Sequence, residues 1–162
     1  MVNLSLVFSI AGMALSLYAL HVEHESSQDS SFRSLCDFSP EVSCSKVFQS
    51  EYGKIWSKLG LIPKDSVLDQ PNALYGFVFY CIIATTTFFK KNAIASHVAL
   101  FFGAASVLLS AYLGYILAFV MKHFCALCVS TYVCNGGIFI DSYIKLKARR
   151  EEIKAEKAKK KT

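Results

Sequence analysis

Four long apolar segments dominate the hydrophobic pattern of the chain. They cover about residues 2–20, 72–89, 93–121 and 124–144 of the 162 residues. A helix needs roughly 20 predominantly apolar residues to cross a hydrocarbon core of about 30 Å. The pattern therefore predicts an all-α membrane protein, built as a bundle of four transmembrane helices.

The connection between the first two predicted spans, residues 21–71, is long and polar. Pro71 suits the first turn of the second span, which places Asn72 at the end of that helix nearest the loop. Part of the loop, "SPEVSCSKVFQSEYGKIWSKLG", predicts short amphipathic helices that lie over the end of the bundle as a cap. Its apolar residues at helical spacing are Val42, Val47, Phe48, Tyr52, Ile55, Trp56 and Leu59.

Composition supports a membrane environment. The chain is 54% hydrophobic and only 18% charged, which is too apolar for an ordinary soluble domain. The first segment has no Lys or Arg before its apolar run and no clear cleavage site, so we interpret it as a retained span rather than a signal peptide. Residues 1–145 are thus expected to form one transmembrane domain, followed by a basic tail, 146–162.

The distribution of charge predicts the orientation. Residues 21–70 carry five Lys/Arg against eight Asp/Glu, whereas residues 145–162 carry nine against three, and Lys90 and Lys91 lie in the second connection. Because positive residues favour the cytosolic side, both termini should be cytosolic, with the 21–71 loop and the "MKHF" turn opposite. The net charge of +5 then reflects topology rather than nucleic-acid binding. The ending Lys159-Lys160-Lys161-Thr162 is similar to the dilysine signal of endoplasmic reticulum membrane proteins.

Two of the six cysteines form a C-x-x-C motif at the start of the last span, in "KHFCALCVSTYVCNGG". Such spacing is typical of a zinc half-site or of a thioredoxin-like redox pair, and the membrane setting favours redox chemistry. Three residues apart on a helix, Cys125 and Cys128 share a face, and the helix N-terminus favours a thiolate. Tyr132 lies one turn deeper on that face. A pocket holding two thiols and a phenol is suited to a lipid-soluble quinone.

A second pair, Cys36 and Cys44, lies in the polar loop. Two thiol pairs on the same side of the membrane, in an oxidising compartment, are typical of a disulfide relay. A structural disulfide in the loop is the alternative. Zinc bound by all four of these cysteines is a further alternative that the eight-residue loop spacing disfavours. Cys81 and Cys134 fall within spans and are expected to be small core residues.

Four stretches, in order, resemble the vitamin K epoxide reductase family, which includes the vitamin K epoxide reductase-like enzymes. They are "LSLYALHVE", "LCDFSPEVSCSKVF", "VLDQPNALYGFVFY" and "FCALCVSTYV", and the resemblance covers about residues 10–145. It implies a four-helix bundle in the endoplasmic reticulum membrane whose lumenal end holds a naphthoquinone ring under a capping loop. It also implies that coumarin anticoagulants such as warfarin occupy the same pocket.

The resemblance implies a role for each cysteine of the two pairs. Cys125 and Cys128 are the catalytic pair, and Cys128 contacts the substrate. Cys36 and Cys44 shuttle electrons, with Cys44 exchanging with Cys125.

The resemblance also implies which residues bind substrate. Asn72 and Tyr132 match residues that hydrogen-bond the quinone or epoxide oxygens, and Phe48 matches an aromatic residue that lines the pocket. No metal is expected.

The function expected from this resemblance is reduction of vitamin K 2,3-epoxide to the quinone, and of the quinone to the hydroquinone. Electrons come from thioredoxin-like lumenal oxidoreductases or from small dithiols, with no tightly bound cofactor. Two alternatives remain. One is a quinone-coupled oxidase that makes disulfides for other proteins, and the other is a non-enzymatic tetraspan adaptor whose cysteines are structural.

Overall fold

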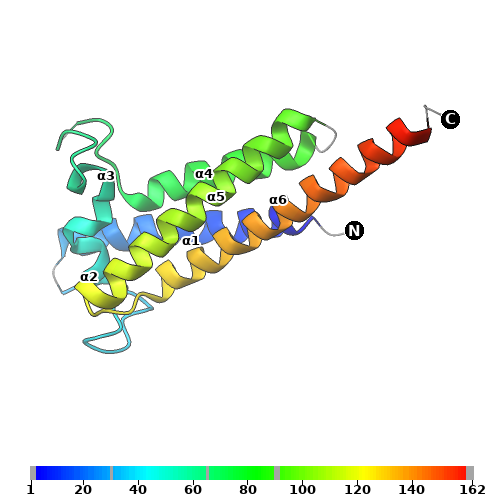
Figure 1. Ribbon diagram of the computed structural model, residues 1–162. Helices are drawn as coiled ribbons and strands as arrows, with labels where there is room; N and C mark the ends of the chain where they lie inside the picture. The colour runs from blue at the N-terminus through cyan, green and yellow to red at the C-terminus, as the bar shows by residue number, and fades with distance from the viewer. Residues whose placement is uncertain (1–2, 30, 65, 90–91, 160–162) are drawn as a thin grey trace.

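Helices form most of the described part of the protein (Figure 1). The computed structural model describes residues 3–29, 31–64, 66–89 and 92–159, and within them only an isolated bridge between Val42 and Phe124 has extended pairing. Its long helices are α1 (Leu4–Gln28), α4 (Asn72–Thr86), α5 (Ala93–Tyr115) and α6 (Ala126–Lys159). A 3₁₀ turn, η2 (Thr87–Phe89), continues α4, and a π-helical turn, η3 (Ile116–Val120), continues α5. The all-α fold class is confirmed.

Three stretches are long and apolar enough to cross a membrane by length and composition: Leu4–Gln28, Asn72–Phe89 and Ala93–Val120. They correspond to the first three predicted spans. The fourth predicted span, 124–144, lies mostly in α6, which begins at Ala126 and does not join this group in the described part of the chain. This helix also holds Asn135, Asp141 and the charged tail, so its composition alone does not identify it as a span.

The bundle is held by close contacts of α1 with α4 and α6, and of α5 with α6. Glycines allow these close approaches. A side chain at Gly12 of α1 would collide with the ring of Tyr80 in α4, and one at Gly137 of α6 would collide with Phe8. Small residues at helix interfaces let backbones approach closely, as expected for membrane helices that gain little from apolar burial alone.

Two helices run further than their apolar segments. The first continues past residue 20 to Gln28, and α6 continues through the basic tail to Lys159 (Figure 1). Hydropathy marks where lipid contact ends, whereas a helix continues while its residues favour helical hydrogen bonding, as Lys, Glu and Ala do in the tail. Residues 151–159 are exposed throughout. Lys90, Lys91 and 160–162, used in the charge and dilysine predictions, lie outside the described residues.

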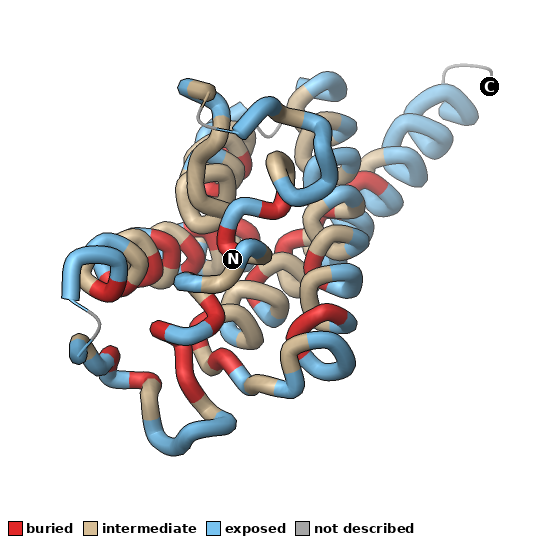
Figure 2. The backbone as a smooth tube through the Cα atoms, turned by 90° about the vertical axis from the view of Figure 1, so that its left-hand side faces the viewer, coloured by how far each residue is buried: buried red, intermediate tan, exposed pale blue. Residues whose placement is uncertain are grey.

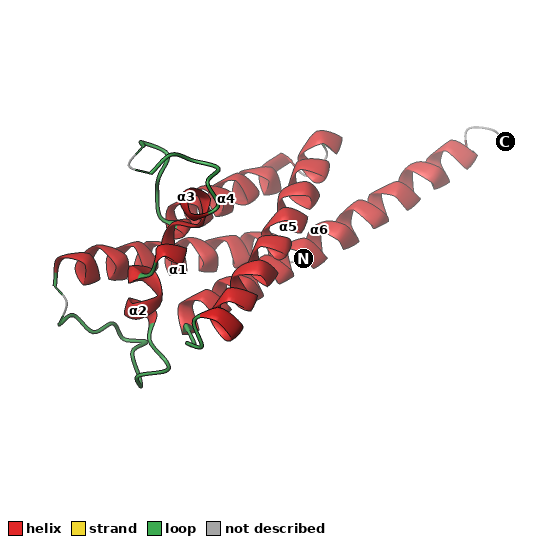
Figure 3. Ribbon diagram, turned by 60° about the vertical axis from the view of Figure 1, so that its left-hand side comes forward, coloured by secondary structure: helices red, strands yellow, loops and turns green. Residues whose placement is uncertain are grey.

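The predicted short helices between the first two spans are present. They are α2 (Cys44–Gln49), η1 (Glu51–Lys54) and α3 (Ile55–Lys58), and they gather at the end of the bundle where α5 turns into α6 (Figures 1 and 3). Figure 2 shows buried positions both in this loop and on the inner faces of the helices. The helix α4 begins at Asn72, where the second predicted span starts, and Pro71 is its N-cap rather than a residue of its first turn.

A candidate redox site at the loop end of the bundle

The C-x-x-C motif lies at the N-terminus of α6. This helix begins at Ala126, so Cys125 precedes it instead of belonging to it, and Cys128 lies in its first turn. The backbone N–H of Cys128 donates a hydrogen bond to the sulfur of Cys125, 3.3 Å away. Cys125 therefore acts as a cap, accepting from one of the N–H groups that a helix start leaves without an intrahelical partner.

The two cysteines differ in their access to open space. Cys125 is completely buried, whereas Cys128 is partly buried and lines a cavity of about 370 Å³. The residues lining that cavity do not include Cys125. Because only Cys128 faces the space that a ligand can occupy, the geometry suits a division in which Cys128 attacks and Cys125 resolves.

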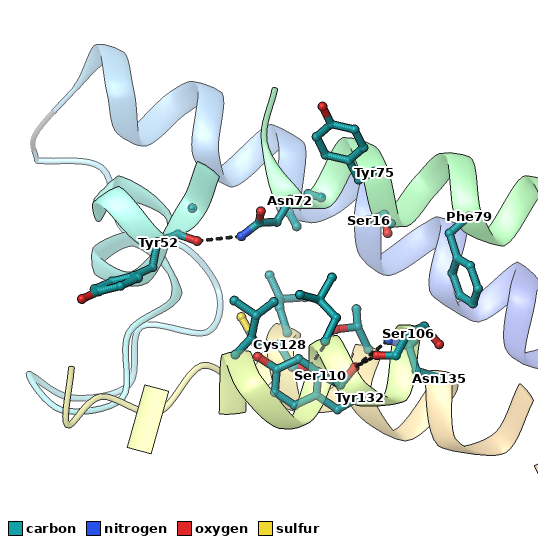
Figure 4. A pocket seen from close by; sticks show the side chains of 18 of the residues that line it. Ser16, Tyr52, Asn72, Tyr75, Phe79, Ser106, Ser110, Cys128, Tyr132 and Asn135 are labelled. Atoms are coloured by element: carbon teal, nitrogen blue, oxygen red, sulfur yellow. Dashed lines mark hydrogen bonds between the residues drawn. The ribbon is translucent and has the colours of Figure 1, made fainter. Parts of the chain in front are cut away.

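Residues from all four long helices and from the loop helices enclose the cavity. In Figure 4, Asn72, Tyr75 and Phe79 of α4 lie on one side, and Cys128 and Tyr132 of α6 lie on the other. Loop residues complete the end nearest the disulfide. The lining contains three substrate-binding candidates, Asn72, Tyr132 and Phe48, together with the aromatic residues Tyr52 and Trp56 of the loop. A mostly apolar enclosure with a few polar groups is typical of small-molecule sites.

The side chain of Asn72 also supports the loop. Its oxygen accepts a hydrogen bond from the backbone N–H of Ile55 at 3.0 Å, and its nitrogen donates to the carbonyl of Tyr52 at 2.6 Å (Figure 4). An amide nitrogen carries two hydrogens, so one bond to Tyr52 leaves the second for a ligand. Asn72 thereby connects the start of α4 to the turn between η1 and α3.

Cys36 and Cys44 form a disulfide with their Cα atoms 5.8 Å apart, whereas Cys125 and Cys128 are free thiols. Cys44 opens α2, and Ser43 caps that helix by accepting from the N–H of Lys46. Both loop cysteines and Cys125 belong to one buried apolar cluster, which also contains Val22 of α1. The two thiol pairs are therefore neighbours, although about 80 residues separate them in sequence.

Backbone hydrogen bonds dock the disulfide loop on the motif. The N–H of Ser43 donates to the carbonyl of Phe124 at 3.0 Å, and the N–H of Phe124 donates to the carbonyl of Glu41 at 2.7 Å. These bonds flank the bridge between Val42 and Phe124. Since Phe124 adjoins Cys125 and Ser43 adjoins Cys44, the pairing fixes the two cysteines in a defined register.

Sequence reasoning did not identify a polar network on the inner side of the cavity. The hydroxyl of Tyr80 donates to the side-chain oxygen of Asn135 at 2.9 Å, and the Asn135 nitrogen donates to the hydroxyl of Ser110 at 2.8 Å. All three residues line the cavity. Tyr80 is also almost completely buried. Polar residues within apolar segments are the signal that would have indicated them.

Other candidate residues lie away from the cavity or have local partners. Cys134 is buried in a cluster with Tyr80 and Ile138, and Cys81 contacts the sulfur of Met13 at 3.6 Å, which agrees with a packing role for both. The ring nitrogen Nδ1 of His123, two residues before Cys125, is enclosed. In the part of the chain that the structure describes, no three His, Cys, Asp or Glu residues are grouped to hold a metal.

Comparison with known proteins agrees with this arrangement. The profile of the vitamin K epoxide reductase family matches residues 3–143. The chain is 37% identical over 145 residues to "Vitamin K epoxide reductase complex subunit 1" of Rattus norvegicus, covering 89% of each protein. It is 37% identical over 142 residues to the Mus musculus protein of the same name, covering 87% of this chain and 88% of the relative. The chain belongs to the vitamin K epoxide reductase family.

Proposed function

We propose that the protein reduces vitamin K 2,3-epoxide to the quinone, and the quinone to the hydroquinone, with thiols as the source of electrons. One observation carries this proposal: Cys128 opens into the same apolar cavity as Tyr132 and Asn72. A nucleophilic sulfur and two hydrogen-bond donors thus surround a space suited to a lipid-soluble ring. The names of the rat and mouse relatives support the choice of substrate.

In the proposed reaction the Cys128 thiolate attacks the ring, and Asn72 and Tyr132 hydrogen-bond the oxygens on which negative charge develops. Cys125 then attacks the sulfur of Cys128, which releases the product and leaves a Cys125–Cys128 disulfide. For the epoxide, two thiols are oxidised to one disulfide and the epoxide oxygen leaves as water. For the quinone, the same two electrons and two protons give the hydroquinone.

The loop pair restores the catalytic dithiol. Reduced Cys44 exchanges with Cys125, and Cys36 then closes the loop disulfide, which a thioredoxin-like protein reduces again. The disulfide between Cys36 and Cys44, beside free thiols at Cys125 and Cys128, matches the state that follows such an exchange. Dithiothreitol is small enough to replace the protein reductant in an assay.

The proposed location is the endoplasmic reticulum membrane, with both termini cytosolic and the site lumenal. The first half of α6 serves as the fourth span, since it packs along α1 and α5, two of the three helices that are apolar enough to cross. The loop helices then cap the lumenal end of the bundle, because Phe48, Tyr52 and Trp56 close the cavity there. Coumarin inhibitors are expected to compete for this cavity.

A quinone-coupled oxidase that makes disulfides is the second candidate. The oxidised loop pair supports it, because a Cys36–Cys44 disulfide is the form that accepts electrons from substrate thiols. In that direction the electrons pass from Cys44 to Cys125 and Cys128 and on to a quinone. Reduced ribonuclease and ubiquinone test this direction: formation of ribonuclease disulfides without turnover of vitamin K epoxide would favour the oxidase.

The deciding assay measures conversion of vitamin K epoxide by membranes that contain the protein, with dithiothreitol as reductant. Wild-type protein is expected to produce vitamin K quinone, and Cys128→Ala is expected to produce none. Cys81→Ala is the matched control, since Cys81 does not line the cavity. No conversion by the wild type, with the protein folded and its loop disulfide formed, would reject the proposed activity and favour a tetraspan adaptor.

A further inference from the structure

The carboxylate of Asp37 is the centre of a hydrogen-bond network in the disulfide loop. One oxygen accepts from the backbone N–H of Ser34 at 2.8 Å and from the hydroxyl of Ser45 at 2.6 Å. The other accepts from the hydroxyl of Ser43 at 2.8 Å and from the backbone N–H of Ser45 at 3.1 Å. The three serines are buried. Both oxygens of Asp37 are therefore held by donors enclosed in the loop.

This network keeps Asp37 charged. Partial burial raises the pKa of the Asp37 carboxyl, but hydrogen bonds from Ser45, Ser34 and Ser43 outweigh that effect and bring the pKa well below its usual range. The carboxylate is thus ionised at neutral pH. Hydrogen bonds to an ionised acceptor are roughly twice as strong as those between neutral groups.

The three serines that supply these four donors lie next to the two loop cysteines. Ser34 lies two residues before Cys36, and Ser43 and Ser45 are the immediate neighbours of Cys44. Asp37 therefore links the segment that carries Cys36 to the segment that carries Cys44, as the disulfide also does. Unlike the disulfide, this link does not depend on the oxidation state of the sulfurs.

The linked loop is also in contact with the catalytic motif. Ser43, which donates its hydroxyl to Asp37, donates its backbone N–H to the carbonyl of Phe124, the residue before Cys125. A continuous path of hydrogen bonds thus runs from Asp37 through Ser43 to the segment that carries Cys125. The same path holds Cys44, the next residue after Ser43.

We propose that Asp37 is a positioning residue for thiol–disulfide exchange, which keeps Cys44 beside Cys125 while the loop disulfide is open. The inference rests on the proposed function. In the exchange, the Cys44 thiolate attacks Cys125 of the Cys125–Cys128 disulfide and Cys128 leaves as a thiolate. The Cys36 thiolate then attacks Cys44, closes the loop disulfide and releases Cys125. Two electrons pass from the loop dithiol to the motif, and a thioredoxin-like dithiol replaces them.

The need for such a residue follows from the order of these steps. Exchange starts with the loop reduced, when no Cys36–Cys44 bond joins the two segments that carry these cysteines. Holding reacting groups together raises their effective concentration by reducing the entropy lost on reaction. The hydrogen bonds to Asp37 do not involve sulfur, so in the proposed role they persist in the reduced loop and maintain the effective concentration of Cys44 near Cys125.

The test measures the effective concentration of Cys44 toward Cys125 directly. In purified protein with Cys36→Ala and Cys128→Ala, a glutathione redox buffer oxidises Cys44 and Cys125 to a disulfide, whose fraction is read by mass spectrometry. Adding Asp37→Ala is expected to lower the effective concentration about 10-fold or more, because bonds to a charged acceptor are lost. Asp37→Asn, which retains the shape and part of the acceptor capacity, should lower it less.

Asp29→Ala is the matched control. Asp29 is a carboxylate of the same loop that accepts from Ser31, and among the described residues its side chain has no hydrogen bond to the segments that carry Cys36 and Cys44. It should leave the Cys44–Cys125 equilibrium unchanged. An unchanged equilibrium in both Asp37 variants would overturn the proposal, as would an equal change in Asp29→Ala.

Turnover gives a second readout in the chain with all its cysteines. Asp37→Ala and Asp37→Asn should slow conversion of vitamin K epoxide driven by a thioredoxin-like protein much more than conversion driven by dithiothreitol. Equal losses with the two reductants would indicate a merely structural role and reject the positioning role. If the wild type converts no epoxide, the proposed activity fails, while the Cys44–Cys125 equilibrium still decides the role of Asp37.

Discussion

The two cysteine pairs have the same chemistry in contrasting surroundings. Cys36 and Cys44 are joined in a polar loop whose shape is maintained by hydrogen bonds from three serines to Asp37. Cys125 and Cys128 are free thiols at the start of α6, beside an apolar cavity. The loop pair thus lies in a polar segment outside the long helices, and the motif pair lies where a lipid-soluble ring has room.

This contrast suits the proposed division of one redox reaction between two cysteine pairs. A pair that contacts substrate needs a preorganised cavity, and a pair that contacts a reductant needs a segment able to exchange partners. The bridge between Val42 and Phe124 joins the two regions, which suits the proposed exchange between Cys44 and Cys125. Loss of one pair or the other can be distinguished by comparing turnover driven by a protein reductant with turnover driven by dithiothreitol.

The largest effect is expected from removing either cysteine of the motif. Cys125→Ala and Cys128→Ala should lower conversion of vitamin K epoxide by roughly 1,000-fold or more with either reductant, because one thiol cannot both attack and resolve. Product formation measured by chromatography checks this, and Cys125→Ala is expected to accumulate an adduct on Cys128. Substantial turnover by Cys128→Ala with dithiothreitol would place the catalytic sulfur elsewhere.

Removing a loop cysteine should produce a loss that depends on the reductant. Cys36→Ala and Cys44→Ala should abolish turnover driven by a thioredoxin-like protein yet retain much of the activity with dithiothreitol, which reaches the motif directly. The same chromatographic assay with the two reductants measures the ratio. A structural disulfide makes the opposite forecast, in which activity falls alike with both reductants and thermal stability falls with it.

Smaller losses are expected at the polar residues of the cavity. Asn72→Ala should weaken turnover by about 5- to 150-fold, since a lost hydrogen bond in a buried site costs roughly 1–3 kcal/mol. It also removes the bonds to Ile55 and Tyr52, so limited proteolysis should show faster cleavage in residues 51–58. Steady-state kinetics and proteolysis together separate the two roles.

Tyr132→Phe provides the comparison, because Tyr132 lines the cavity on α6, across from the turn that Asn72 supports. It should reduce turnover on a similar scale and weaken coumarin inhibition, while cleavage in residues 51–58 stays at the wild-type rate. Wild-type kinetics in both variants would show that the substrate binds in another place.

The smallest predicted effect concerns acid stability of the loop. The folded-state pKa of Asp37 is below its usual range, so the carboxylate contributes stability above its unfolded pKa of about 3.9, and this contribution is lost as pH falls through the folded value. The difference in thermal stability between wild type and Asp37→Asn should therefore be full at neutral pH, begin to shrink below about pH 4, and close only as the pH approaches the much lower folded pKa. A difference that persists or grows in acid would contradict the assignment.

The sequence was sufficient to predict the helices but less informative about where they end. Apolar segments identified α1, α4 and α5 because lipid-facing residues must be apolar over the whole span. The length of α1 and α6 was underestimated, since both continue into polar sequence that favours helix without being apolar. The motif at the start of α6 was evident from its spacing, because the chain itself places those two cysteines together.

Hydrogen-bond partners that lie far apart in the chain were harder to predict from the sequence. The roles given to Asn72 and Phe48 came from family resemblance, whereas Tyr132 was also expected beside Cys128 from its helical spacing. The structure adds that Asn72 bonds the backbone at Tyr52 and Ile55. Backbone partners leave no pattern in side-chain identity, so they could not be predicted. The network around Asp37 could not be predicted for the same reason, since two of its four donors are backbone N–H groups.

The location of the disulfide after a single turnover tests the account most directly. Fully reduced protein is mixed with one equivalent of vitamin K quinone, which accepts only two electrons, the thiols are blocked, and the disulfides are mapped by mass spectrometry. Wild type should finish with Cys36 joined to Cys44 and with Cys125 and Cys128 free, whereas Cys44→Ala should finish with a Cys125–Cys128 disulfide. Hydroquinone formed by Cys44→Ala while Cys125 and Cys128 both remain thiols would contradict the relay.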